Sequence, residues 1–183
     1  MGPAIQLTPN LILRVEDESK ACEVLELYLR NKTQFEEFEP TRPTDFYTID
    51  YHITALRREY RAYMLGTFLR YYIYSRTDDS KIIGSVNFNL YFDETEYYAE
   101  IGYKIDHMYQ NRGYAYEACV AGMDIISHYY GIKRIDARIH PDNAPSLCLA
   151  RKMNFRYMVM EPQSANIKGR YEDLIRYTHY HSV

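Results

Sequence analysis

Residues 100–117, Glu-Ile-Gly-Tyr-Lys-Ile-Asp-His-Met-Tyr-Gln-Asn-Arg-Gly-Tyr-Ala-Tyr-Glu, decide how the rest of the chain is arranged. The first part of this stretch predicts a strand, the last part predicts the start of a helix, and residues 110–115 form a tight turn between them. Gly113 in the turn lets the backbone come close to a bulky group. The first turn of a helix leaves N–H groups without partners and carries about half a positive charge. The turn therefore predicts a phosphate-binding site, although a plain turn also explains a lone glycine.

The composition is that of a globular protein. The chain has 183 residues, of which 46% are hydrophobic and 26% charged, so we expect a single domain over residues 1–183 with one substantial core. A net charge of −3 and the lack of a basic run argue against nucleic-acid binding. The sequence has neither a long apolar run nor a secretory signal pattern, so we expect no membrane association and a cytoplasmic location.

The three cysteines, Cys22, Cys119 and Cys148, predict neither a disulfide framework nor a metal site. Their number is odd and none of them has the CxxC spacing of a zinc ligand pair. We expect each to be a small buried apolar side chain and the protein to need no metal.

The first half of the chain alternates between helical and strand patterns. Prolines in residues 35–43 prevent a helix there. Short polar turns between the later strands predict an antiparallel meander. We expect strands at residues 11–15, 67–75, 81–92 and 97–106, and helices at residues 17–31 and from Thr44 or Asp45 to Met64.

Acidic residues outnumber basic ones between residues 35 and 50. This local excess would attract a cationic substrate, but a solvated acidic loop is the simpler explanation. The acids Glu36, Glu37, Glu39, Asp45 and Asp50 stand against one base, Arg42.

The second half predicts a helix between two parallel strands. From Gly113 the apolar residues recur with helical spacing, and Gly131 is a plausible end of the helix. A strand at 134–140 then completes a right-handed βαβ unit, so it should run parallel to the strand at 97–106. We expect a last helix from Asn143 to Asn154 and strands at 155–161 and 171–181.

In element order and in its motifs, the chain resembles the GNAT acetyltransferase superfamily, and within it the RimJ/RimL-type N-acetyltransferases. The resemblance implies an α+β fold: a mixed, mostly antiparallel sheet of roughly six to seven strands, about four helices, and a splayed parallel pair that forms the acetyl-CoA cleft. The motifs are Gln110-x-x-Gly113-x-Ala115, flanked by Ala99-Glu100-Ile101-Gly102-Tyr103 and Tyr116-Glu117-Ala118, and Asn143-x-x-Ser146 followed by Lys152-Met153-Asn154-Phe155.

The resemblance implies direct acetyl transfer from acetyl-CoA to a primary amine in a ternary complex. The N–H of Ile105 would face the thioester carbonyl. The acceptor would be a protein N-terminus or a small molecule, and the family leaves room for a homodimer. Residues that would contact acetyl-CoA are Ile105, His107, Gln110, Arg112, Gly113, Tyr114, Ala115, Asn143 and Ser146.

Glu100 is the candidate base that removes the proton of the amine. A salt bridge from Glu100 to Lys104 or another cation is an equally good explanation. At Ala150, where many family members carry a tyrosine that protonates the departing sulfur, this chain has no acid. The sulfur would leave as thiolate or take a proton through Ser146. Two other functions stay open: a polyamine or small-amine acetyltransferase, and a non-catalytic acyl-CoA-binding domain.

Overall fold

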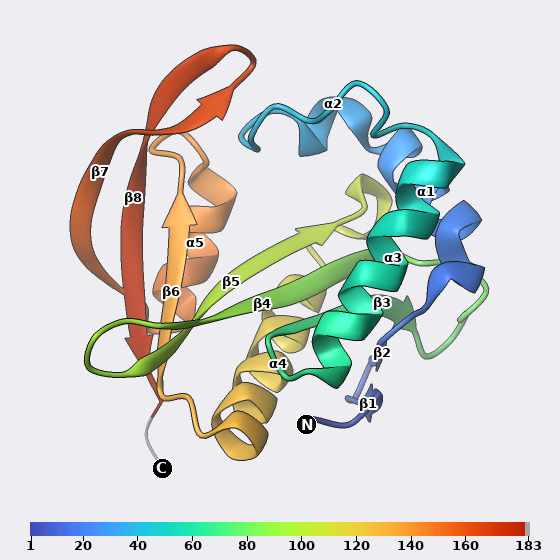
Figure 1. Ribbon diagram of the computed structural model, residues 1–183, viewed down its shortest axis with the longest axis horizontal. Helices are drawn as coiled ribbons and strands as arrows, with labels where there is room; N and C mark the ends of the chain where they lie inside the picture. Colours follow the sequence, from blue (N-terminus) through green and yellow to red (C-terminus); the bar gives the residue numbers. More distant parts are fainter. Residues whose placement is uncertain (182–183) are drawn as a thin grey trace.

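The computed structural model describes residues 1–181 and contains one sheet with helices on both faces (Figure 1). The strands are β1 (Ile5–Leu7), β2 (Leu11–Arg14), β3 (Phe68–Ser75), β4 (Gly84–Phe92), β5 (Tyr97–Ile105), β6 (Arg134–Ile139), β7 (Arg156–Ile167) and β8 (Arg170–Tyr180). The α-helices are α1 (Ala21–Arg30), α2 (Lys32–Phe35), α3 (Ile49–Met64), α4 (Tyr114–Tyr130) and α5 (Ala144–Lys152), with 3-10 turns at Glu18–Lys20 and His107–Tyr109.

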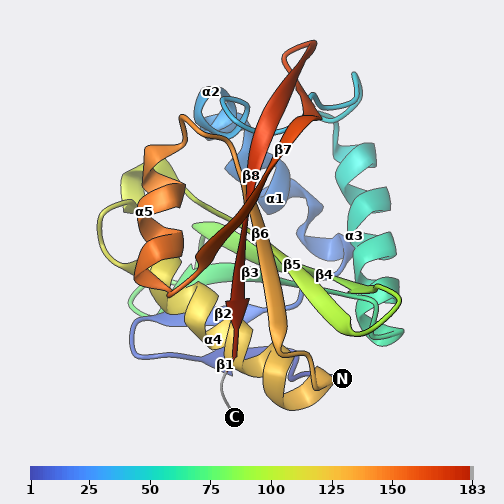
Figure 2. The same ribbon diagram turned by 90° about the vertical axis from the view of Figure 1, so that its left-hand side faces the viewer.

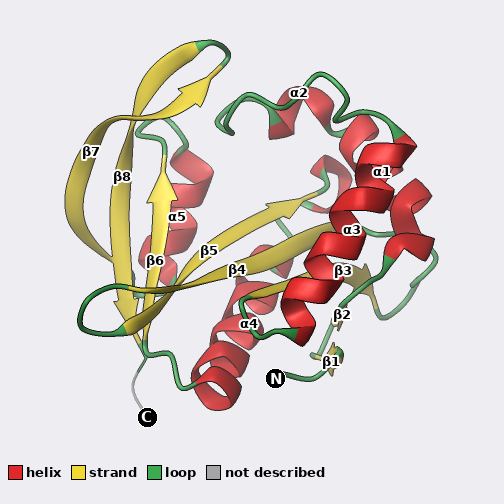
Figure 3. Ribbon diagram, in the orientation of Figure 1, coloured by secondary structure: helices red, strands yellow, loops and turns green. Residues whose placement is uncertain are grey.

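The sheet has the order β1-β2-β3-β4-β5-β6-β8-β7 and is antiparallel except at its centre. There β5 and β6 run parallel and pair at three positions, Tyr98 with Arg134, Ala99 with Ile135 and Glu100 with Asp136. Beyond these pairs the two strands diverge toward their C-terminal ends (Figure 3). The predicted splayed parallel pair is therefore confirmed.

The two larger hydrophobic cores lie on opposite faces of the sheet, under the helices that Figure 2 shows on its two sides. Helices α4 and α5 cover one face, where Gly122 lets α4 approach the sheet closely, since a Cβ there would lie 2.7 Å from the Phe88 ring. Helices α1 and α3 cover the other face, where Val24, Leu27 and Leu56 are buried against Tyr72. The single sheet therefore carries a separate layer of helices on each face.

The fold class predicted from the sequence is confirmed, with two more elements than expected. The sheet has eight strands because β1 pairs with β2, and the fifth helix is the single turn α2. Three and four residues are too few to show a periodic pattern. Strand β7 also extends past residue 161 to Ile167, with irregular pairing to β8 that a simple alternation does not predict.

The predicted cap of the second helix was wrong. Neither Thr44 nor Asp45 begins α3; Thr48 does, its hydroxyl accepting a hydrogen bond from Tyr51 N at 3.3 Å. The residues before it form turns that bury Phe46 in the core, so the helix starts later. The three cysteines are free, but only Cys119 is buried, whereas Cys22 and Cys148 are exposed on the outer surfaces of their helices.

Three predicted helix ends are confirmed. Gly131 ends α4 with φ +68°, and Asn154 follows α5 with φ +61°. Both conformations are left-handed, which glycine and asparagine accept most readily. Asn143 caps α5 by accepting a hydrogen bond from Ser146 N at 3.2 Å.

Candidate active site

The first turn of α4 presents its backbone to the outside. Gly113 has φ +81°, and a Cβ at this position would meet no atom of the protein within 4 Å. Glycine is needed here for the left-handed conformation, and not because another part of the chain crowds it. The first bond inside the helix runs from Glu117 N to Gly113 O at 3.0 Å. The N–H groups of Tyr114 and Ala115 therefore have no partner within the helix.

The side chains of the preceding turn leave this backbone accessible. Gln110, Asn111 and Arg112 are exposed, and Arg112 bends back to donate to the Met108 carbonyl at 3.2 Å. The positions predicted from the first motif thus lie together on one exposed turn. Its free N–H groups and the positive end of α4 suit an anion.

Glu117 fixes this turn to the N-terminal hairpin. Its carboxylate accepts hydrogen bonds from the Thr8 hydroxyl at 2.6 Å and from the Asn10 backbone and side-chain nitrogens at 2.7 and 2.9 Å. Burial disfavours the charged form, but these hydrogen bonds outweigh it and lower the pKa of Glu117. Glu117 belongs to a motif found in the sequence, but its role as an anchor depends on contacts with distant residues.

The backbone of β5 faces the gap between the strands. Asp106 N donates to Ile83 O at 2.9 Å, on the β4 side. Because backbone groups alternate in direction along a strand, the Ile105 N–H points the other way, toward β6. Pairing with β6 has already ended at Glu100, so this N–H faces the splayed region, as the sequence predicted.

His107 connects the end of β5 to α1. Its backbone N and its ring Nδ1 both donate to the side-chain oxygen of Asn31, at 2.9 and 2.8 Å. The neighbouring Asp106 is buried and pairs with Arg30. Burial opposes the charge of this carboxylate, yet the hydrogen bond from Arg30 lowers the pKa of Asp106. The His107 side chain is exposed beside these contacts.

The Tyr103 side chain extends from β5 to the start of α5. Its hydroxyl donates to the Ser146 carbonyl at 3.4 Å, on the helix that Asn143 caps. Burial raises the pKa of Tyr103 above its ordinary range, so the hydroxyl stays neutral. Ala150 is fully buried in the same helix. The sequence analysis overlooked Tyr103, although strand alternation places it on the same face as Ile105.

Glu100 forms a salt bridge with Arg138 of β6. The two carboxylate oxygens lie 2.9 Å from Nε and 3.2 Å from Nη2 of that guanidinium. Burial alone would disfavour the charge of Arg138, but attraction to Glu100 outweighs it and raises the pKa of Arg138. The salt bridge considered from the sequence therefore exists, with Arg138 as the partner in place of Lys104.

Lys104 instead neutralises the acidic segment before α3. It lies 2.5 Å from the Glu39 carboxylate, which also pairs with Arg42 at 2.8 Å. Glu36 accepts a hydrogen bond from the Tyr47 hydroxyl at 2.6 Å. Within this segment, Glu39 is therefore neutralised by two basic side chains, and Glu36 is hydrogen-bonded by a tyrosine.

The predicted residues divide between the two faces of the sheet. Ile105, the turn at Gly113 and the start of α5 belong to the α4 and α5 face, whereas Glu100 and Lys104 belong to the α3 face. The splayed region of β5 and β6 connects the two faces. Within residues 1–181, no three His, Cys, Asp or Glu side chains are grouped as metal ligands. No described helix is long and apolar enough to cross a membrane.

Comparisons with known proteins agree with this architecture. The probable N-acetyltransferase YjcK of Bacillus subtilis (strain 168) is 25% identical over 164 residues, 90% of each chain. The [ribosomal protein uS5]-alanine N-acetyltransferase of Escherichia coli (strain K12) is 24% identical over 178 residues, covering 93% of this chain and 88% of that protein. Both relatives are similar over nearly their whole length.

Solved structures share the fold. The ribosomal-protein-S5-alanine acetyltransferase from Vibrio fischeri superposes with a TM-score of 0.89 at 20% identity, covering 97% of both chains. RimL, a ribosomal L7/L12 α-N-protein acetyltransferase in complex with coenzyme A, gives a TM-score of 0.85 at 22% identity, covering 96% of this chain and 97% of that one. The family described as acetyltransferase (GNAT) domain matches residues 10–156. The chain therefore belongs to the GNAT family and is an acetyltransferase.

Proposed function

We propose that this acetyltransferase passes the acetyl group of acetyl-CoA directly to a primary amine, with both substrates bound at once. The observation that carries the proposal is the opening between β5 and β6, which joins the exposed turn of α4 on one face to Glu100 on the other. Two reactants that enter from opposite faces can meet there without a covalent intermediate. Holding them in contact supplies several kcal/mol of the rate enhancement.

Backbone groups of one short stretch would hold acetyl-CoA. The N–H groups at Arg112, Gly113, Tyr114 and Ala115 would bind its pyrophosphate, and the positive end of α4 favours that charge. The Ile105 N–H would donate to the thioester carbonyl, whose oxygen becomes negative as the amine attacks. Donors of this kind contribute about 2.7–4 kcal/mol in other enzymes. His107, Gln110, Asn143 and Ser146 would complete the contacts.

Glu100 would take the proton from the attacking amine. A lysine side chain has a reference pKa of about 10.4 and an α-amino group about 8, so most of the amine is protonated at neutral pH. Two contacts with Arg138, at 2.9 and 3.2 Å, hold the Glu100 carboxylate in one orientation. Glu100 is therefore positioned to act as the base.

The departing sulfur would leave as a thiolate. A reference thiol has a pKa of about 8.5, so the thiolate is accessible near neutral pH without an acid. Ala150 supplies no proton, but the Tyr103 hydroxyl lies on the same face of β5 as Ile105 and would exchange its hydrogen bond to the Ser146 carbonyl for one to the developing negative charge. Tyr103 thus takes part of the role that the missing tyrosine would have.

The acceptor that we favour is a protein N-terminus, because the E. coli relative is named as a ribosomal-protein alanine N-acetyltransferase. Calorimetry with acetyl-CoA and a thiol-release assay with N-terminal peptides, lysine peptides and polyamines would test the proposal. We expect micromolar binding and turnover with at least one amine. Binding without turnover of any amine would overturn direct transfer, and failure to bind acetyl-CoA would overturn the α4 site itself.

A further inference from the structure

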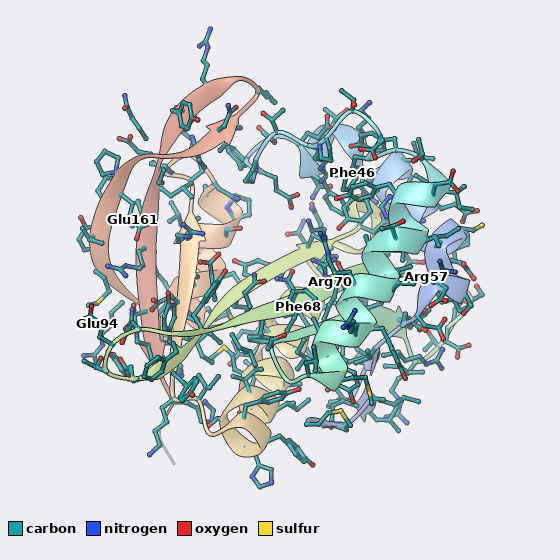
Figure 4. All side chains as sticks on the ribbon, in the orientation of Figure 1. Phe46, Arg57, Phe68, Arg70, Glu94 and Glu161 are labelled. Atoms are coloured by element: carbon teal, nitrogen blue, oxygen red, sulfur yellow. The ribbon has the colours of Figure 1, made fainter. Side chains whose placement is uncertain are left out.

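A hollow of about 320 Å³ lies between α3 and the sheet, near the C-terminal end of β5. This volume lies within the range of small-ligand sites. Figure 4 shows Arg70 beside α3, Phe46 near one end of that helix and Arg57 on its other side. Side chains from four elements and a loop line the hollow, among them Tyr28, Arg42, His52, Arg70, Tyr72 and Lys104.

Positive charge exceeds negative charge in this hollow. Four basic side chains line it, against two carboxylates, Glu39 and Glu59. The ring of His52 adds no charge at pH 7, because burial, and then repulsion from Arg42, lower its pKa to about 4. Arg58 at the exposed rim of the hollow makes none of the ion pairs found among residues 1–181. A concave surface with excess positive charge attracts anions and repels polyamines.

Two buried polar atoms at the hollow, His52 Nε2 and Arg70 Nε, have no hydrogen-bond partner among residues 1–181. His52 is only 2% exposed, and the nearby Phe46 backbone favours a proton on the ring nitrogen that faces it. In the neutral ring the other nitrogen, Nε2, is then an acceptor. Arg70 uses Nη1 to bind Glu59 at 2.5 Å, and its Nε is a donor. A buried group without a hydrogen-bond partner destabilises the protein, and a ligand that supplied the partner would remove this cost.

The hollow lies on the acceptor side of the gap. Lys104 in its wall shares a face of β5 with Glu100. The segment that roofs the hollow continues across the gap, where Thr41 N donates to Asn166 O at 2.7 Å near the end of β7. Phe38 of the same segment stacks on His140 at the end of β6 with ring centres 5.1 Å apart. The segment that roofs the hollow therefore also contacts residues of β7 and the residue after β6, on the far side of the gap.

We propose that this hollow binds a carboxylate carried by the acceptor, with Arg70 Nε donating to the carboxylate and His52 Nε2 accepting from an N–H or O–H group of the same molecule. The inference rests on the proposed function and narrows the range of acceptors. The acceptor is an amine attached to an acidic group, such as the N-terminus of an acidic peptide. A polyamine offers donors for His52 but no negative charge for the basic lining.

Matched acceptors test this charge preference. The probes are the peptides Ala-Glu-Ala-Glu and Ala-Gln-Ala-Gln, which differ little in shape, and spermidine. We expect kcat/KM to be at least about tenfold higher for the glutamate peptide and the advantage to shrink as salt screens it. Equal rates for the two peptides, or a faster reaction with spermidine, would overturn the inference while leaving acetyl transfer intact. No acetyl-CoA binding and no turnover would instead indicate that the proposed function has failed.

Variants locate the preference in the hollow. Arg58→Gln removes an exposed charge from the rim and should reduce the glutamate advantage about threefold, whereas Arg61→Gln, on the same helix outside the lining, should preserve it. His52→Asn retains a donor near Phe46 but lacks the Nε2 acceptor, so it should raise KM for both peptides more than His52→Gln does. Acetyl-CoA affinity should be unchanged in all four. An unaltered preference in Arg58→Gln, or equal KM values for the two His52 variants, would refute the assignment.

Discussion

The two sides of the gap between β5 and β6 are built in different ways. On the α4 side, the groups offered to a ligand are mostly backbone N–H groups from one continuous stretch, 105–115. On the α3 side, they are side chains such as Arg42, His52, Arg70 and Lys104, which come from separate elements. Most substitutions change side chains but not backbone N–H groups, so the α4 side can stay the same while the α3 side changes. On the proposed assignment, acceptor recognition can therefore change without altering co-substrate recognition.

The strongest test of the α4 side is Gly113→Asp. A side chain at φ +81° costs about 1–2 kcal/mol, and a carboxylate beside the pyrophosphate removes a charge-assisted contact worth about 1.5–3 kcal/mol. We expect the Kd for acetyl-CoA to rise several hundredfold in calorimetry.

Two controls separate strain and location from charge. Gly113→Asn has nearly the same shape without the charge and should bind more tightly than Gly113→Asp. Gly131→Asp places the same residue at the other left-handed glycine of α4, where φ is +68°, and should leave the Kd within about twofold. Equal losses in Gly113→Asp and Gly131→Asp would show that the phosphate does not lie at Gly113.

The next largest effect is expected on the α3 side, from Glu100→Gln. Loss of a general base costs at least about 100-fold in rate, so kcat should fall by that factor while the Kd for acetyl-CoA stays the same. Glu161→Gln is the matched control, because Glu161 also approaches Arg138, at 4.0 Å, but lies on β7. Wild-type turnover in Glu100→Gln would remove Glu100 from the mechanism and leave it as a structural partner of Arg138.

On the α3 side, the low pKa of His52 should make the free energy of unfolding depend on pH. Burial first, and then Arg42, lower the pKa of His52 from 6.5 to about 4. Between these values the unfolded chain binds a proton that the folded chain excludes. The free energy of unfolding should therefore fall by about 2–3 kcal/mol as the pH drops from about 6.5 to about 4. Urea unfolding of the wild type and His52→Gln at pH 7 and 4.5 would measure this, and identical losses in both proteins would contradict it.

The smallest effect should come from Tyr103→Phe, at the boundary of the two sides. Removing the hydroxyl deletes a neutral hydrogen bond worth about 1 kcal/mol, so we expect kcat to fall about fivefold with little change in acetyl-CoA affinity. Tyr98→Phe, earlier on β5 and stacked on Tyr91, is the control. A kcat that is unchanged in Tyr103→Phe would show that the sulfur departs without help from this hydroxyl.

The sequence predicted the structure well at positions where the local backbone accepts only a few residue types. Left-handed backbone at Gly113, Gly131 and Asn154 and the cap at Asn143 leave such signatures, and they located the α4 side of the gap. The splayed pair came from the order of elements together with the family resemblance.

Contacts between distant residues left no such signature. Glu100 meets Arg138 only because β6 lies beside β5, and Lys104 meets Glu39 across a separation of 65 residues. The hollow under α3 depends in the same way on the fold as a whole. Local spacing therefore predicted the residues that we assign to the co-substrate and missed those that we assign to the acceptor.

The short parallel ladder at the centre of the sheet has a mechanical consequence. In the described structure, the parallel ladder between strands β1–β5 and strands β6–β8 consists of only three residue pairs. A molecule bound between β5 and β6 beyond this ladder would contact both groups of strands and hold them together. Saturation by such a molecule at 100 times its Kd would add about 2.7 kcal/mol to the free energy of unfolding. Substrate occupancy would thus be measurable as resistance to heat, even before any reaction is followed.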